Sequence, residues 1–185
     1  MTKMNSTTFP ILKTERLTLR QLSIDDKLDI FALLSDPGVN KYLNRQPCHT
    51  VEDAIIFINK VNDNIEKNGT YYWAITLTDS KTLLGTICLF DFSSEKSSCE
   101  IGYELMTKFQ GNGYMKEALK KVIDYVFQTL KVKKILAFTH CENQNSTSLL
   151  MKLNFVKSII PDKENPSLNM FTLTHIDSQQ EIKTN

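Results

Sequence analysis

Apolar and polar residues recur along the first third of the chain with two different periods. Residues 12–22 alternate between apolar and polar positions, which predicts a half-buried strand. Helical spacing then appears twice, from Ser23 to a stop at Asp36-Pro37-Gly38 and from Thr50 to Asn68-Gly69. The pattern therefore predicts one strand followed by two helices.

The rest of the chain alternates strand-like runs with two further helical segments. The predicted strands comprise residues 71–77, 83–90, 99–106, 134–139, 155–160 and 170–175. A short helix is predicted at residues 146–153. The strongest helical stripe consists of Met115, Ala118, Leu119, Val122, Ile123, Val126, Phe127 and Leu130.

This order of elements predicts an α/β (α+β) fold, in which a mixed sheet carries helices on its faces. The helix at 115–130 connects the strands at 99–106 and 134–139, so these two strands should be parallel. With no repeat or linker, residues 1–185 are expected to form a single domain. Its core should span about residues 10–175, followed by a polar tail at Ser178–Asn185.

The stretch Gln110-Gly111-Asn112-Gly113-Tyr114-Met115 lies between a predicted strand and the longest helix. Two glycines at such a junction leave backbone N–H groups bare at the positive end of a helix, which favours a phosphate or pyrophosphate site. Asn-Gly is also a hairpin signal, but helical spacing follows it. The dinucleotide-binding fingerprint is disfavoured because Lys116 occupies its third glycine position.

Composition narrows the classes of partner. The net charge of +1 provides no global field for nucleic acid, and no apolar run approaches the ~18 residues of a membrane helix. The N-terminus lacks the apolar core of a secretory signal, so we expect a cytoplasmic protein with no nucleic-acid or membrane partner. No metal is expected, because the cysteines and histidines show no metal-ligand spacing: Cys48, Cys88, Cys99, Cys141, His49, His140 and His175.

These motifs together resemble the GNAT acetyltransferase superfamily, and within it the ribosomal-protein alanine and serine N-acetyltransferases. The superfamily signature Gln/Arg-x-x-Gly-x-Gly/Ala is matched by Gln110 and Gly113, with Met115 where a small residue is usual. Three more stretches match: residues 12–20, Glu100-Ile101-Gly102-Tyr103, and Asn143-Gln144-Asn145-Ser146 through Phe155. The resemblance implies a mostly antiparallel sheet whose parallel strand pair is splayed, with a bulge, at the cofactor site.

The resemblance further implies acetyl-CoA as cosubstrate, attacked directly at its thioester by an amine. Backbone N–H groups of the glycine loop would bind the pyrophosphate, and strand-edge amides would hold the pantetheine arm and the thioester oxygen. An asparagine after the next strand would contact CoA. The cofactor-binding residues predicted in this way are Leu105, Met106, Gln110, Gly111, Asn112, Gly113, Tyr114, Met115 and Asn143.

Three residues are candidates for proton transfer. Glu100 and Glu104 share one face of their strand and could accept the proton of the amine or bind a cationic acceptor; the alternatives are a structural acceptor and a solvated side chain. Ser146 could donate to the leaving sulfur, or could instead bond backbone at the start of its helix. Many relatives carry a tyrosine for this purpose where Leu150 stands here.

The identity of the acceptor is the most open question. The resemblance favours a protein N-terminal amine of the ribosomal type; a small amine such as a polyamine, an amino sugar or an antibiotic is the first alternative. Arg45, Gln46 and His49 fall in a loop that shapes the acceptor site in the family. Met115 and Leu150 keep a third alternative open, a non-catalytic acyl-CoA-binding sensor. The C-terminal strands are compatible with a homodimer.

Overall fold

The computed structural model of the chain describes residues 9–159 and 165–175. An eight-stranded sheet in the order β1-β2-β3-β4-β5-β6-β8-β7 forms its middle layer. The strands are β1 (Leu12–Lys13), β2 (Leu17–Gln21), β3 (Tyr71–Leu77), β4 (Leu83–Phe90), β5 (Ser98–Leu105), β6 (Lys134–His140), β7 (Val156–Lys157) and β8 (Leu168–Thr174). The polar tail expected at residues 178–185, and Ile160 of an expected strand, lie outside the described residues.

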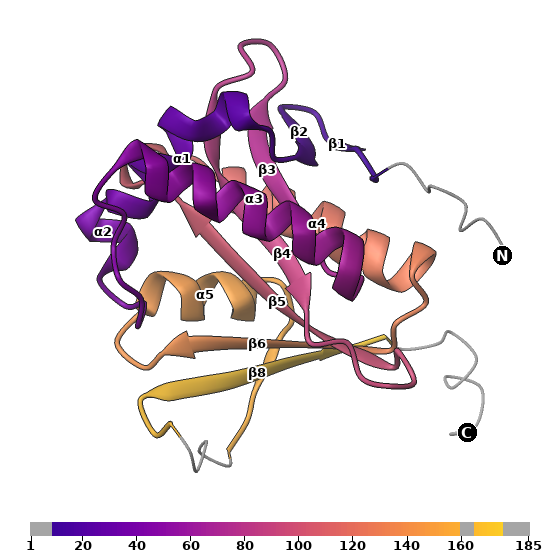
Figure 1. Ribbon diagram of the computed structural model, residues 1–185. Coiled ribbons are helices and arrows are strands. Elements are labelled where there is room, and N and C mark those ends of the chain that lie inside the picture. The colour runs from indigo at the N-terminus through magenta and orange to yellow at the C-terminus, as the bar shows by residue number, and fades with distance from the viewer. Residues whose placement is uncertain (1–8, 160–164, 176–185) are drawn as a thin grey trace, which may run out of the picture.

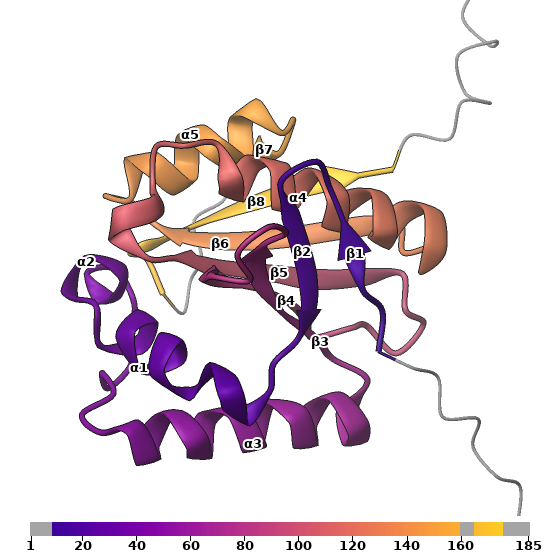
Figure 2. The same ribbon diagram turned by 90° about the horizontal axis from the view of Figure 1, so that it is seen from above.

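Helices cover both faces of this sheet (Figure 1). Seen from above, α1 and α3 lie on one side of the sheet and α4 and α5 on the other (Figure 2). The helices are α1 (Lys27–Ser35), α2 (Pro37–Asn40), α3 (Val51–Asn68), α4 (Tyr114–Asp124) and α5 (Gln144–Lys152). The predicted α/β class, with a mixed sheet between helical layers, is confirmed.

The strands β5 and β6 are the parallel pair of the sheet, as the crossover helix predicted; the other paired strands are antiparallel. They pair only from Ser98–Glu100 to Lys134–Leu136, and both strands then continue apart (Figure 1). The implied splay is therefore confirmed. The implied bulge is not in β5, because the β4–β5 register runs without a shift; the irregularity lies between β3 and β4.

Gly85 explains how β5 leaves β6 without a bulge. A Cβ atom at Gly85 would collide with the backbone carbonyl of Glu104 on β5. Because glycine has no Cβ, β4 and β5 stay closely paired up to Leu105 while β6 follows its own course. The opening at the carboxyl end of the parallel pair thus lies beside a part of β5 that stays closely paired with β4.

Two predicted elements differ from the sequence pattern. The strand expected at 12–22 is a hairpin, β1 and β2, with a turn in which Thr14 Oγ1 accepts the N–H of Leu17 at 2.9 Å. The alternation continues through both arms, so the pattern alone does not reveal the turn. The helix expected up to Leu130 is α-helical to Asp124 and then forms a π-helical turn at Tyr125–Thr129, which lets both Tyr125 and Val126 face the sheet.

The signals that begin and end the other helices are confirmed. Thr50 and Asp53 form a reciprocal capping box at α3, and Gly69 ends this helix in the left-handed region with φ of 64°. Asp36-Pro37 ends α1, but the same residues also begin α2, where Asp36 accepts from Gly38 N at 2.8 Å.

The core consists of two apolar clusters, one on each face of the sheet. The larger lies against α4 and α5 and contains Trp73, Met115 and Leu150; the smaller lies against α1 and α3 and contains Met106. The four cysteines are free thiols, and none of the described helices is both long and apolar enough to cross a membrane.

Candidate active site

The glycine loop has the geometry of an anion site. Gly111 and Gly113 lie in the left-handed region, with φ of 80° and 79°, and Gly113 begins α4 without a side-chain cap. The first bond of the helix runs from Glu117 N to Gly113 O, at 3.1 Å. The N–H groups of Tyr114, Met115 and Lys116 therefore precede the first helical hydrogen bond and remain for a ligand.

The polar side chains of this loop bond to its own backbone. Gln110 Nε2 donates to Leu105 O at 3.0 Å, and Asn112 Nδ2 donates to Phe109 O at 3.2 Å. Met115, the departure from the family signature, is 6% exposed and points into the larger core. Its bulk therefore lies beneath the loop and leaves the loop surface to backbone amides.

One contact to this loop was not predicted from the sequence. Arg16, in the turn between β1 and β2, forms an ion pair with Glu117 of α4 at 2.7 Å, and its Nη1 donates to Asn112 O at 3.2 Å. Burial alone would raise the pKa of Glu117, but bonds from Thr14 and Arg16 outweigh it and lower this pKa. The partners lie 101 residues apart, and only the match of residues 12–20 to the family marked this segment.

The strand amides expected to hold the thioester differ in availability. Met106 N donates to Leu84 O at 2.9 Å, so the expectation of a free amide at Met106 is wrong. Because the amides of a strand alternate in direction, the N–H of Leu105 points to the other side, toward β6. Leu105 lies beyond Glu100, where the pairing with β6 ends. Leu105 is therefore a strand residue whose amide faces the opening, at its outer end.

A pair of hydroxyl groups lies between β5 and α5. The Tyr103 hydroxyl and Ser146 Oγ are 2.8 Å apart, so the helix-start serine bonds a side chain across the splay. Burial raises the pKa of Tyr103 to about 12 against a lowering bond from Ser146, so the phenol keeps its proton at neutral pH. Tyr103 lies within a stretch that matches the family, but the sequence did not predict a role for it. The candidates on this strand were Glu100 and Glu104, and Tyr103 points to the other face of the strand.

The structure also defines the other two α5 residues considered from the sequence. Asn143 Oδ1 accepts the N–H of Ser146 at 3.1 Å, so Asn143 caps this helix. Leu150 is fully buried in the larger core, and its side chain provides packing there and no hydroxyl group.

The two candidate carboxylates have different environments. Arg45 donates to both oxygens of Glu104, at 2.7 and 2.8 Å, and Arg45 Nε is held by Asn40 Oδ1 at 2.8 Å. Glu104 is therefore paired, and it lies toward the open end of β5. Glu100 lies at the closed end, opposite Leu136, where burial and the nearby Asp91 raise its pKa. The structure brings Glu104, but not Glu100, to the splay.

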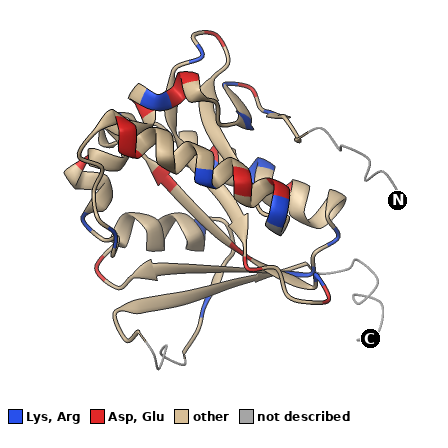
Figure 3. Cartoon of the chain, viewed as in Figure 1, with Lys and Arg blue, Asp and Glu red and all other residues tan. Residues whose placement is uncertain are grey.

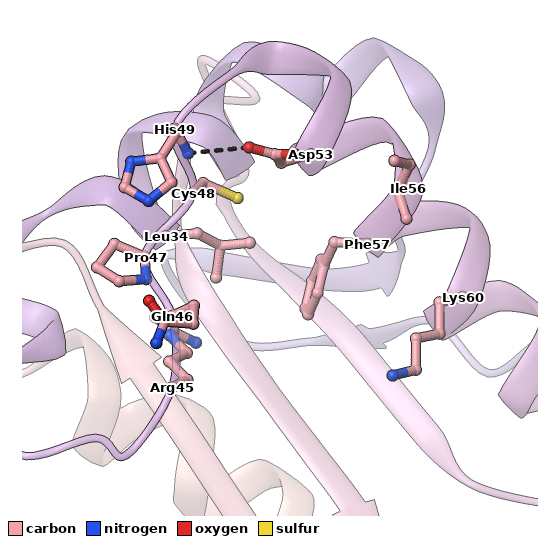
Figure 4. Close-up of a pocket in the computed structure, with 10 residues that line it drawn as sticks. All are labelled: Leu34, Arg45, Gln46, Pro47, Cys48, His49, Asp53, Ile56, Phe57 and Lys60. Carbon is pink, nitrogen blue, oxygen red and sulfur yellow. Dashed lines mark hydrogen bonds between the residues drawn. The ribbon is translucent and has the colours of Figure 1, made fainter.

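A pocket of about 400 Å³ lies between α3 and the loop after α2 (Figure 4), and Glu104 is connected to it through Arg45. Arg45 belongs both to the pocket wall and to the pair with Glu104. The only acidic residue that lines this pocket, among the described residues, is Asp53, which accepts from His49 N and Thr50 N as a helix cap. The lining comprises Leu34, Arg45, Gln46, Pro47, Cys48, His49, Asp53, Ile56, Phe57 and Lys60.

The segment that contains α2 is attached to both edges of the splay, through the residue before this helix and through the loop after it. Tyr42 stacks on His140 at the end of β6, with ring centroids 5.6 Å apart. At the other edge, Asp36 accepts from the backbone N of Thr107 at 3.0 Å and from its hydroxyl at 2.9 Å, just after β5. Gly38 lies so close to the Thr107 hydroxyl that a Cβ there would collide with it.

Charges on the molecule are mixed. Lysines are interspersed with aspartate and glutamate along the helix α3, as Figure 3 shows. Within residues 9–159 and 165–175, no group of three or more histidine, cysteine, aspartate or glutamate side chains is arranged to hold a metal ion.

Residues 16–156 match a family model described as an acetyltransferase (GNAT) domain. An uncharacterised N-acetyltransferase of Bacillus subtilis, YoaA, is 34% identical over 149 residues, which cover 80% of this chain and 84% of that protein. The fold is similar to a ribosomal L7/L12 α-N-protein acetyltransferase, RimL, in complex with coenzyme A (TM-score 0.78, 15% identity, 89% and 98% of the two chains). It is also similar to a Vibrio cholerae spermidine N-acetyltransferase in complex with CoA and spermine (TM-score 0.74, 22% identity, 87% and 96%).

Proposed function

This chain belongs to the GNAT acetyltransferase family and is an acetyl-CoA-dependent N-acetyltransferase, and we propose that it acetylates the N-terminal amine of a protein by direct attack on the thioester. The observation that carries the proposal is the convergence of three features on the splay between β5 and β6. These are the anion loop, the Leu105 amide and the Tyr103–Ser146 hydroxyl pair.

On the cofactor side, the backbone amides at the start of α4 bind the pyrophosphate of acetyl-CoA. The N–H of Leu105 donates to the thioester oxygen, whose negative charge grows as the amine nitrogen bonds to the carbonyl carbon. When the carbon–sulfur bond breaks, its electron pair leaves with the sulfur, and the hydroxyl of Ser146 stabilises the thiolate by a hydrogen bond. Tyr103 orients that hydroxyl from 2.8 Å away. The second proton of the amine nitrogen passes to the thiolate, which leaves a neutral amide and CoA thiol.

On the acceptor side, Glu104 takes the proton that the ammonium must lose before attack. Its place near the open end of β5 and its connection to the pocket through Arg45 support this role. The two hydrogen bonds from Arg45 fix the orientation of Glu104 until the acceptor arrives. Glu100 has no role in this scheme, because it lies where β5 and β6 are still paired.

The charge of the pocket supports a protein N-terminus over a polyamine. A polyamine carries several positive charges, which would need unpaired carboxylates around it. Here Asp53 caps a helix, Glu104 and Arg45 pair with each other, and Lys60 adds positive charge. A peptide brings one ammonium group together with neutral or acidic residues, which these side chains can accommodate.

The experiment is release of CoA thiol from acetyl-CoA in the presence of single amines. The panel contains peptides that begin with Ser, Ala or Thr, the same peptides with a blocked N-terminus, polyamines and aminoglycosides. We expect release with free N-terminal peptides alone. Release of CoA only with a polyamine or an aminoglycoside would show that the acceptor is a small amine and not a protein N-terminus. Binding of acetyl-CoA with no release of CoA in the presence of any amine would favour the non-catalytic sensor.

A further inference from the structure

The carboxylate of Glu117 is surrounded by donors from the turn between β1 and β2. Thr14 Oγ1 lies 2.5 Å from Glu117 Oε1, and the backbone N of Arg16 lies 3.0 Å from the same oxygen. The Arg16 side chain binds the other oxygen through Nε and Nη2, each at 2.7 Å. The first turn of α4 is thus tied to a hairpin from the opposite end of the sequence.

The same guanidinium group contacts Asn112 and Tyr114 and lies next to Gly113, the residues that lead the chain into α4. Its Nη1 donates to the carbonyl of Asn112 at 3.2 Å. Its Nη2 is the nearest atom, at 3.6 Å, to the position of a Cβ at Gly113. Its central carbon lies 4.5 Å from the centre of the Tyr114 ring, a cation–π contact. Arg16 therefore lies along one side of the loop assigned to the pyrophosphate.

The negative charge of Glu117 would weaken the binding of a pyrophosphate at this loop unless the charge is neutralised. A carboxylate in the first turn of a helix interacts favourably with the helix dipole when nothing else is bound. It also repels an anionic ligand at the same helix end, less than two turns away. Arg16 balances this charge and directs its remaining N–H groups toward the loop.

We propose that Arg16 is a positioning residue for acetyl-CoA, which neutralises Glu117 and holds the loop 112–114 in the conformation that receives the pyrophosphate. This inference rests on the proposed function, because it assumes that this loop binds the phosphates. It assigns a task to the hairpin β1–β2, which supplies no group to the reaction itself. It predicts that the effect of Arg16 on affinity depends on whether Glu117 is charged.

The test compares R16M, R16K, E117Q and R16M/E117Q in the full chain, with dissociation constants for acetyl-CoA and steady-state kinetics. We expect R16M to weaken binding by about tenfold, with KM for acetyl-CoA raised and kcat retained. R16K keeps the charge but loses the planar fork, and should recover part of the affinity. E117Q should bind at least as tightly as the wild type, and the double variant should recover most of the loss of R16M.

The affinity of E117Q for acetyl-CoA distinguishes two roles for Arg16: neutralising the charge of Glu117, and only stabilising the fold. If E117Q weakens binding as much as R16M does, and the double variant is no better, the proposal is overturned. R20M is the matched control, since Arg20 forms a similar pair with Asp26 away from the loop, at 2.6 Å; it should lower the thermal midpoint and leave the affinity unchanged. A wild type that does not bind acetyl-CoA would refute the proposed function itself, whereas binding that is equal in all variants would refute only the role of Arg16.

Discussion

Two arginine–glutamate pairs flank the strand β5, and they differ in how many groups hold each carboxylate. Glu117, on the cofactor side, accepts from Thr14 and from the backbone and side chain of Arg16. Glu104, on the acceptor side, accepts from the side chain of Arg45 alone among the described residues, and is connected through it to a pocket. The first pair is part of the framework, whereas the second can exchange its partner.

If Glu104 is the base, as we propose, an ion pair alone does not distinguish a structural carboxylate from a reactive one. The two pairs have nearly equal distances, 2.7 Å for the shortest contact in each. What differs is the number of further donors and access to the pocket. A carboxylate saturated by its own fold cannot take a proton from a substrate without losing several bonds, whereas Glu104 loses only those of one arginine.

The largest effect should come from breaking the cofactor side at Gly113. In Gly113→Val, a β-branched residue would have to adopt φ of 79° and would cover the exposed amides, so acetyl-CoA binding should be lost in calorimetry. Gly69→Ala is the control, because Gly69 is also left-handed, at 64°, but lies at the end of α3. It should lower stability and leave binding intact; a folded Gly113→Val protein with normal affinity would refute the loop assignment.

On the acceptor side, we expect the next largest loss of activity from a substitution of Glu104. Glu104→Gln keeps the size and removes the base, so kcat should fall by about 10²-fold while the affinity for acetyl-CoA is retained. Glu100→Gln, measured in parallel, tests the assignment of the two carboxylates. A larger loss of kcat in Glu100→Gln than in Glu104→Gln would reverse it.

A smaller effect is expected from the hydroxyl pair between the two sides. Ser146→Ala and Tyr103→Phe should each lower kcat by about tenfold under conditions where chemistry limits the rate, because each removes one member of a hydrogen-bonded pair. The double variant should lose less than the product of the two single effects. Full additivity, or an unchanged kcat in Ser146→Ala, would remove the pair from the mechanism.

The smallest effect that we expect is on the pH dependence of the free energy of unfolding. The pKa of Glu117 lies below its ordinary value of 4.5 in the folded protein, so its stabilising contribution is complete above pH 4.5 and is lost as the pH falls through the folded value. The difference in unfolding free energy between wild type and Glu117→Gln, under about 1 kcal/mol, should shrink from pH 7 to pH 3 in urea titrations. A constant difference would contradict this role.

Local patterns were enough to predict most of the fold and the loop. The capping box at Thr50 and the glycines at 111 and 113 act through neighbours in sequence, so their signals are visible without the structure. The hairpin turn at Thr14 was missed because both arms continue the same alternation. The contacts of Arg16, Arg45 and Tyr103 join distant segments, and no spacing rule relates such pairs. These contacts decide which carboxylate is free to react.

The hydrogen bonds between Asp36 and Thr107 have a consequence for how the binding of one substrate affects the binding of the other. They join the start of α2, the helix that precedes the pocket loop, to the segment just ahead of the glycine loop, so we expect a shift that acetyl-CoA causes there to reach the pocket. Such a linkage is reciprocal: if bound acetyl-CoA raises affinity for the peptide, the peptide raises affinity for acetyl-CoA by the same factor. We expect positive cooperativity between the two substrates, and we expect Asp36→Asn to reduce it when the dissociation constant of each is measured with and without the other.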